Sequence, residues 1–227
     1  MTLERRTLYH FQLCPFSRKV RLYLYEKGIP FGLINEVPWV RRQGLLALNP
    51  MGDLPVFVEP DGSVLTQHNA ICEYLNELVP EPNLMGETIK GRAEIRRITG
   101  WFDSSFYMDV LKPLIGERVI KAMKTGAAPN SLIIRAARDN LKNYLTYLDW
   151  LAAHRPYYLG GRLMSMADLC VAAHLSVLDY LGEISWEKYP EIKFWYVKIK
   201  SRPSFNSLLR DKFAGIMPAE SYANLDF

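Results

Sequence analysis

The junction between residues 11 and 16 restricts the fold of this chain more than any other feature of the sequence. A largely apolar, strand-like run at residues 8–11 ends here, and Pro15 follows directly after Cys14. Beyond the proline, apolar side chains recur at the spacing of a helix, at Phe16, Val20, Tyr23 and Leu24. Because proline is favoured in the first turn of a helix, the pattern predicts a strand that turns directly into a helix.

The predicted helix has the thiol of Cys14 at its N-terminus. Unpaired backbone N–H groups and the helix dipole favour a thiolate there, and Arg18 and Lys19 add positive charge, so a low thiol pKa is expected. Ser17 stands where a Cys-x-x-Cys motif has its second cysteine, so the thiol lacks a resolving partner at that spacing. A second interpretation stays open, in which Cys14 is a small, semi-buried residue at the turn.

The length and composition are typical of a soluble globular protein. With 227 residues, 49% of them hydrophobic, the chain can bury the core of one large domain or two small ones. No stretch approaches the roughly 20 uninterrupted apolar residues of a membrane span, and we expect neither an export signal nor an anchor. An odd number of distant cysteines favours reduced thiols in a cytoplasm: Cys14, Cys72 and Cys170.

The charged residues do not indicate nucleic acid as a partner. The formal charge of +4 arises from 28 basic and 24 acidic residues that are mixed along the chain, without a block of lysine and arginine. The histidines are scattered, without the spacing of metal ligands: His10, His68, His154 and His174. We therefore expect no nucleic-acid site and no metal site.

The first 79 residues read as one compact layer with a mixed sheet. Gly28 ends the first helix, residues 31–37 form a second strand, and residues 54–65 form a hairpin with Pro55 at its entry. A helix at residues 69–78 follows. The order is strand, helix, strand, short helix, hairpin and helix, which one domain of about 80 residues can accommodate.

Strand signals disappear beyond Gly86, and long helical periods take their place. A helix is predicted from Glu87 to about Lys112; it bends or breaks at Pro113 and resumes through Met123. Aromatic residues in these helices, such as Trp101 and Tyr144, are interpreted as core or dimer interface rather than substrate pocket. Further helices are expected from Ser131, after a capping box at Ser165 and Asp168, over residues 192–200, and from Arg202.

These patterns predict an α+β protein with two domains. Residues 1–79 form the sheet domain, residues 80–86 are a proline-containing linker, and residues 87–211 form an all-helical domain. Residues 212–227 are a C-terminal extension rich in aromatic side chains. A solvated tail would be poorer in aromatics, so we expect the extension to dock either on its own domain or on a partner.

The chain resembles the glutathione transferase superfamily, in which a thioredoxin-like domain precedes a helical domain. The resemblance rests on five motifs spread over nearly the whole chain: Cys14-Pro15, Asn49-Pro50-x-Gly52-x-Leu54-Pro55, Ala70-Ile71-x-x-Tyr74-Leu75, Ser165-x-Ala167-Asp168-Leu169 and Arg202-Pro203-Ser204-Phe205. It implies a homodimer, a cleft between the domains, a cis-proline at Pro55 and Cys14 at or near the nucleophile position. It also implies a glutathione site at Leu54, Pro55, Gln67 and His68.

The sequence departs from this family at the glutathione site. Glutathione-binding relatives have an acidic residue and then a serine before the Ala-Ile helix, whereas this chain has Gln67 and His68. Loss of the hydroxyl weakens a carboxylate site by about 1–3 kcal/mol, although a protonated His68 could donate instead. The departure argues against glutathione without excluding it, so no cofactor is required and glutathione stays a possible ligand.

Within the superfamily, the chain resembles the alphaproteobacterial FtsZ-localized protein A group of cell-division proteins. The residues behind this resemblance are Arg18-Lys19-Val20-Arg21, Trp39-Val40-Arg41-Arg42, Trp101-Phe102-Asp103, Phe106-Tyr107, Leu178-Asp179-Tyr180-Leu181-Gly182, Lys200-Ser201-Arg202-Pro203-Ser204-Phe205 and the stretch from Tyr222 to Phe227. It implies a cytoplasmic homodimer that binds FtsZ filaments at the division site and bridges or curves them. The alternative is a glutathione-dependent transferase or thiol transferase that uses Cys14.

Candidate partner-binding residues follow from chemistry that favours exposure. Trp39 lies beside two arginines in a predicted loop, a composition typical of binding hot spots, although its ring could instead fold over the domain edge. The full set of candidates is Trp39, Arg41, Arg42, Glu117, Arg118, Tyr222, Leu225, Asp226 and Phe227.

Overall fold

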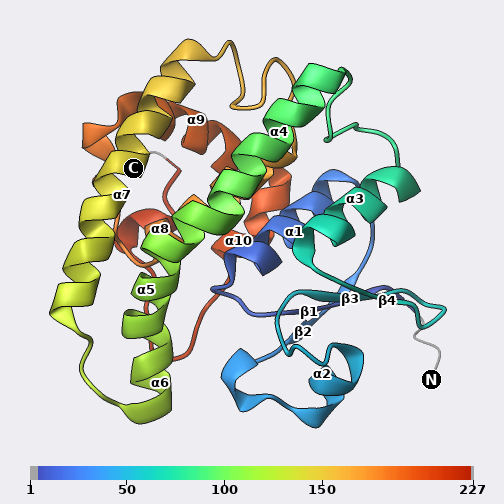
Figure 1. The fold of residues 1–227 in the computed structure, drawn as a ribbon, viewed down its shortest axis with the longest axis horizontal. Helices are drawn as coiled ribbons and strands as arrows, with labels where there is room; N and C mark the ends of the chain where they lie inside the picture. Colours follow the sequence, from blue (N-terminus) through green and yellow to red (C-terminus); the bar gives the residue numbers. More distant parts are fainter. Residues whose placement is uncertain (1–4, 226–227) are drawn as a thin grey trace.

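A computed structural model describes residues 5–225 of the protein. The chain forms a small mixed sheet followed by a larger group of helices, as the sequence predicts (Figure 1). The four strands are β1 (Thr7–His10), β2 (Gly32–Asn35), β3 (Val56–Val58) and β4 (Val64–Thr66), in the spatial order β2-β1-β3-β4. β1 is parallel to β2 and antiparallel to β3, which pairs with β4 as a hairpin.

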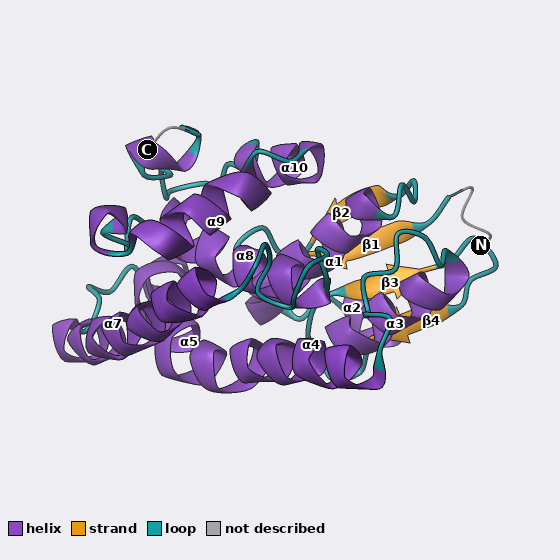
Figure 2. Cartoon of the chain, turned by 90° about the horizontal axis from the view of Figure 1, so that it is seen from above, coloured by secondary structure: helices purple, strands orange, loops and turns teal. Residues whose placement is uncertain are grey.

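The described part of the sheet domain has three α-helices: α1 (Pro15–Glu26), α2 (Gln43–Leu48) and α3 (His68–Leu78). In Figure 1, α1 and α3 lie on one side of the sheet and α2 lies on the other. The parallel β1 and β2 are connected through α1, as a crossover between parallel strands requires. Viewed from above, α1 stands between the sheet and the helices of the second domain (Figure 2).

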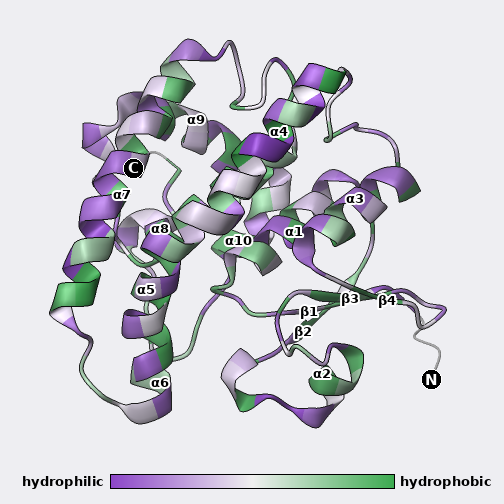
Figure 3. Cartoon of the chain, viewed as in Figure 1, coloured by the Kyte–Doolittle hydropathy of each residue, from purple (hydrophilic) through white to green (hydrophobic). Residues whose placement is uncertain are grey.

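The second domain is helical throughout its described length, apart from its loops. Its α-helices are α4 (Ile89–Trp101), α5 (Lys112–Ile115), α6 (Lys121–Thr125), α7 (Ser131–His154), α8 (Met166–Tyr180), α9 (Pro190–Lys200) and α10 (Asn206–Leu209). Figure 3 shows α7 with alternating hydrophobic and hydrophilic bands, because one of its faces packs inward and the other meets solvent. No helix within residues 5–225 is long and apolar enough to cross a membrane.

The expected break at Pro113 does not occur, and the backbone stays helical from α4 to α6. Between α4 and α5 it is π-helical over Phe102–Leu111, and the N–H of Lys112 bonds to the carbonyl of Tyr107, five residues earlier. Pro113 therefore lies in the first turn of α5, where one hydrogen-bond pattern replaces another. A change of helix type accommodates the proline.

Helix α8 forms the centre of the molecule. All of its residues are buried, and it packs against α1 of the sheet domain. The predicted capping box is present: Asp168 accepts hydrogen bonds from the backbone N–H and the hydroxyl of Ser165, at 3.0 and 2.8 Å. The same carboxylate accepts bonds from the N–H of Leu159 and the indole of Trp195. It thus holds the start of α8 to two other segments.

Candidate functional site

Cys14 occupies the position that the sequence predicts, as the residue immediately before α1. It is partly buried, and its thiol faces the carbonyl of Leu54, with 3.8 Å between sulfur and oxygen. The peptide bond from Leu54 to Pro55 is cis, which confirms the expectation for Pro55. The thiol and the cis-proline loop therefore meet at the edge of the sheet domain.

The expected low pKa of Cys14 is wrong. Burial raises the pKa of its thiol above the ordinary value, although hydrogen bonds from Ser17 and the N–H of Phe16 act in the opposite direction. The two cations predicted to help make their hydrogen bonds elsewhere, although the charge of Arg18 still acts to lower this pKa. Arg18 donates to the carbonyl of Gln12 and to the side chains of Ser176 and Tyr222, and Lys19 points toward α3 and the π-helical segment. Cys14 is therefore a protonated thiol at neutral pH.

Lys19 is completely buried where α1, α3 and the π-helical segment meet. Its ammonium has three N–H donors, and each finds an acceptor: Asp103 at 2.6 Å, Asn69 at 2.7 Å and the Nδ1 of His68 at 2.8 Å. Despite burial, which acts to raise it, the pKa of Asp103 is lowered because Lys19 and two histidines favour its ionised form. The ion pair ties the sheet domain to the helical domain.

His68 cannot replace the missing hydroxyl donor in the way that a protonated imidazole would. Burial and the neighbouring Lys19 lower its pKa to about 4, so the ring is neutral at physiological pH. Its Nδ1 accepts the hydrogen bond from Lys19, which leaves the ring proton on Nε2, and the ring stacks on Phe16 with centroids 4.4 Å apart. Gln67 is exposed, has a φ of 67° and reaches toward Asp53. The glutathione-site positions thus lie together, but with altered chemistry.

The C-terminal extension docks on its own domain, which was one of the two expectations for it. Tyr222 is fully buried, and its hydroxyl accepts a bond from Arg18 and donates to the carbonyl of Leu208, at 3.2 and 2.9 Å. Lys200 donates to the carbonyls of Ser221 and Asn224. Tyr222 is therefore a structural residue rather than a free contact.

The last described residue of the extension lies at the surface. Leu225 is 38% exposed, next to the point where the described residues end. The candidates Asp226 and Phe227 lie outside the described residues.

Trp39 combines the two interpretations that the sequence leaves open. Its ring packs edge-on against Phe11, with centroids 5.4 Å apart, and remains partly exposed. Phe11 in turn contacts Phe213 of the extension at 5.3 Å. Trp39 is thus connected to the C-terminal extension through one aromatic ring.

Arg118 lies close to the same extension. Its guanidinium binds the carbonyl of Leu181 and the carboxylate of Glu183, directly after α8. The backbone of α8 at Tyr180 accepts a bond from the N–H of Ala219 in the extension. Trp39 and Arg118 are therefore each connected to the extension, Trp39 through Phe11 and Arg118 through the segment that follows α8.

Two of the other charged candidates, Arg42 and Glu117, are engaged in local ion pairs. Arg42 is exposed and pairs with Glu36, whereas Arg41 is exposed in a left-handed backbone conformation. Glu117 bonds to Lys121 and to the N–H of Asn130, where α7 begins, and it is therefore partly structural. Sequence reasoning missed Arg138, which joins Arg118 on Glu183.

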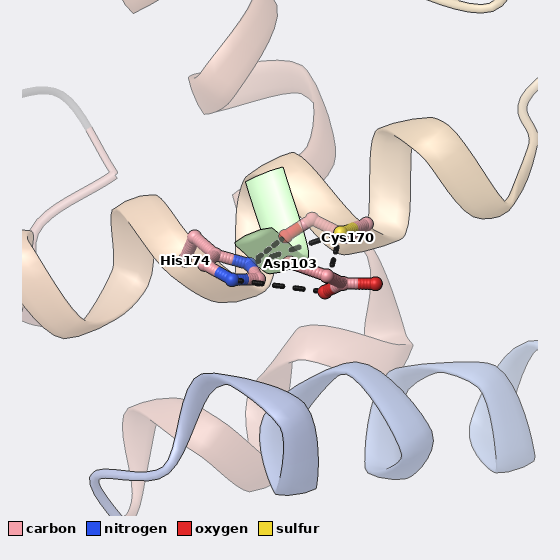
Figure 4. A group of neighbouring side chains, drawn as sticks. All are labelled: Asp103, Cys170 and His174. Carbon is pink, nitrogen blue, oxygen red and sulfur yellow. Dashed lines mark hydrogen bonds and ion pairs between the residues drawn. The ribbon is translucent and has the colours of Figure 1, made fainter. Parts of the chain in front are cut away.

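Sequence reasoning also missed a buried cluster beneath Lys19, made of Asp103, Cys170 and His174. Figure 4 shows the three side chains pointing toward one another, two of them from α8. The sulfur of Cys170 lies 3.3 Å from Asp103 Oδ1, and His174 Nε2 lies 3.7 Å from the same oxygen. A cysteine and a histidine four residues apart share one face of a helix, which is a signal that the sequence does contain.

Comparisons with known proteins agree with the geometry. The profile of the glutathione S-transferase N-terminal domain matches residues 13–78, and that of the C-terminal domain matches residues 128–212. FtsZ-localized protein A of Caulobacter vibrioides is 41% identical over 230 residues, which cover all of both chains.

Two solved structures superimpose closely on the chain. A glutathione S-transferase from Rhodospirillum rubrum is 45% identical, with a TM-score of 0.95 over 98% of this chain and all of that one. FzlA from C. crescentus is 41% identical, also with a TM-score of 0.95, over 98% of this chain and all of its own. The name of the first protein is that of an enzyme, whereas the name of the second is not.

Proposed function

This chain belongs to the glutathione S-transferase family, and within it we propose that the protein is a cell-division factor that binds FtsZ filaments. In this proposal it acts in the cytoplasm at the division site, as a homodimer whose two-fold symmetry bridges or curves filaments. Full-length similarity to FtsZ-localized protein A supports this assignment. Because one fold carries many functions, the choice between enzyme and binding protein depends on the sites.

The observation that carries the proposal is that two partner-type residues lie next to segments that hold the docked C-terminal extension. Trp39 supplies a partly exposed ring, and Arg118 supplies a guanidinium that is 32% exposed. Aromatic and arginine side chains supply most hot spots of protein interfaces. We place the filament contact on this surface, next to the docked extension.

A pair of arginine variants tests this location. Arg118→Ala removes a guanidinium from the proposed surface, while Arg138 still pairs with the buried Glu183. Arg155→Ala is the matched control, since Arg155 is 31% exposed, forms a similar ion pair with Glu94 and follows the far end of α7. In cosedimentation with FtsZ filaments, we expect Arg118→Ala to lower the bound fraction and Arg155→Ala to leave it unchanged. Equal binding by both variants would remove this surface from the proposal.

The second candidate function is a thiol transfer reaction at Cys14. It is favoured by the partly exposed thiol at the start of α1, opposite the cis-proline loop. In such an enzyme the Cys14 thiolate would attack the disulfide of a glutathionylated substrate, form a mixed disulfide with glutathione and release the substrate thiol. The raised pKa of the thiol and the neutral His68 make this the weaker candidate. A Cys14→Ser variant that retains all thiol transferase activity would rule it out.

A further inference from the structure

The buried cluster of Asp103, Cys170 and His174 contains an acceptor without a donor. His174 is fully buried, and its Nδ1 lies 2.9 Å from the carbonyl oxygen of Cys170. A carbonyl only accepts, so Nδ1 carries the ring proton and Nε2 presents a lone pair. Within residues 5–225, this Nε2 has no hydrogen-bond partner. It faces a carboxylate oxygen at 3.7 Å, so two acceptors oppose each other in the interior.

The candidate ligand atoms of the cluster lie close together. Asp103 Oδ1 lies 3.3 Å from the sulfur of Cys170 and 3.7 Å from His174 Nε2, and the sulfur lies 3.8 Å from the other ring nitrogen, Nδ1. Bonds of about 2.0–2.3 Å to one ion, as zinc makes, keep two ligand atoms within about 4.6 Å. Cys170 and His174 come from successive turns of α8, and Asp103 faces them from the π-helical segment (Figure 4).

The outer contacts of the cluster are those of an oriented ligand set. Metal-binding histidines commonly donate their second ring N–H to a carbonyl, as His174 does toward Cys170. Ligating carboxylates are likewise held by hydrogen bonds, and Oδ2 of Asp103 accepts one from Lys19 at 2.6 Å. Asp103 Oδ1 and His174 Nε2 therefore remain available as ligands, and both lie beside the sulfur of Cys170.

Charge balance decides which cation the cluster favours. The ammonium of Lys19 already neutralises the carboxylate of Asp103, and Cys170 carries the proton that it donates to this carboxylate. A cation that replaces this one proton keeps the buried cluster neutral only if its own charge is +1. A divalent ion would leave an uncompensated positive charge in the interior, which is costly.

We propose that Asp103, Cys170 and His174 form a binding site for a single soft monovalent cation, Cu(I). Thiolate and imidazole are ligands that suit copper, with the thiolate selecting its cuprous form. On binding, the sulfur–hydrogen bond of Cys170 is broken, its proton leaves to solvent, and a sulfur–copper bond forms without any change of oxidation state. The rings of Phe16, Phe102 and Phe106 surround His174, at centroid distances of 5.7, 5.6 and 6.0 Å, and exclude water from the ion.

The experiment is an anaerobic titration of the full chain with Cu(I) against a chromophoric Cu(I) chelator. All proteins carry Cys14→Ser, because the partly exposed thiol could take up copper by itself. We expect one Cu(I) per chain, and at least a tenfold loss of affinity in Cys170→Ser and in His174→Gln. Cys72→Ser is the matched control, since Cys72 is equally buried but is not one of the three ligands, and its binding should be unchanged.

A substitution could also lower the stability of the protein. The melting temperature of each variant is therefore measured with and without Cu(I). The parent protein should melt at a higher temperature with Cu(I), and Cys170→Ser and His174→Gln should show no such shift. Binding of Cu(I) that survives both substitutions would overturn the site. Tighter binding of Zn²⁺ than of Cu(I) would overturn the argument from charge balance.

Discussion

Several residues of this protein have chemistry that burial has changed. The cations of α1 illustrate this, because Arg18 and Lys19 follow Cys14 near the start of the helix but donate hydrogen bonds to groups of α3, the helical domain and the extension. The positions of Arg18 and Lys19 on the helix do not indicate which groups they bond to. Tyr222 and Asp103, their partners, lie 204 and 84 residues away along the chain. The thiol is left with burial as the main influence on its pKa, which raises it.

His10 gives a prediction of pH dependence at the same scale. Burial and the nearby Arg21 and Arg18 lower its pKa to about 3, whereas an unfolded histidine titrates near 6.5. The unfolded state therefore binds more protons between these values, and folding stability falls as the pH decreases below about 6.5. From pH 7 to pH 5 this one group should cost about 2 kcal/mol. Urea unfolding at both pH values should show a loss smaller by that amount in His10→Gln, and an equal loss would contradict the assignment.

At the scale of elements, the C-terminal extension is as much a part of the fold as the helices. Its Phe213 contacts Phe11 of the sheet domain, and Tyr180 of α8 donates to the carbonyl of Ile216 at 2.8 Å. The extension is thus held by residues of both domains.

The contribution of this anchoring can be measured at Tyr222. Tyr222→Phe keeps the ring but removes the hydroxyl that accepts from the buried Arg18 and donates to Leu208. We expect the free energy of unfolding to fall by about 1–3 kcal/mol, the cost of leaving buried groups unpaired. Tyr157→Phe serves as the control, because Tyr157 is 62% exposed and should change stability by less than about 0.5 kcal/mol. Equal stability of the two variants would mean that the extension is not anchored by this hydroxyl.

The elements themselves follow from local patterns in the sequence. Periodicity, Pro15 and the capping box at Ser165 place β1, α1 and α8 correctly, since these signals act within a few residues. The sequence did not distinguish a bend from a break at Pro113, because a π-helical segment has no recognisable pattern of apolar spacing. At the candidate site, Cys14 and the cis-proline were predictable by resemblance. The cluster of Asp103, Cys170 and His174 was not, since it depends on packing between two distant helices.

At the scale of the whole molecule, the proposed homodimer requires a surface that can serve as its interface. Aromatic side chains form a continuous strip between α4 and α7, in which Trp101 contacts Tyr144 and Tyr147, and Tyr147 stacks on Trp150. Trp150 is 53% exposed and Tyr147 is 37% exposed. An exposed aromatic strip on a helix pair is typical of an interface, and a second copy of the chain is the occupant we propose.

Sedimentation velocity tests this surface. Trp150→Lys places a charge in the strip, and we expect the variant to sediment as a monomer at concentrations where the native protein is a dimer. Phe194→Lys is the control, because Phe194 is an aromatic residue of α9 that is 75% exposed and lies outside the strip. A dimer that persists in Trp150→Lys would place the two-fold interface elsewhere.

The most direct test of the central claim is cosedimentation of the native protein with GTP-assembled FtsZ filaments, with glutathione titrated by calorimetry into the same preparation. The account predicts saturable binding to filaments, none to unassembled FtsZ with GDP, and no heat from glutathione. Glutathione binding without cosedimentation would contradict the account. It would instead favour a glutathione-dependent transferase with Cys14 as the reactive group.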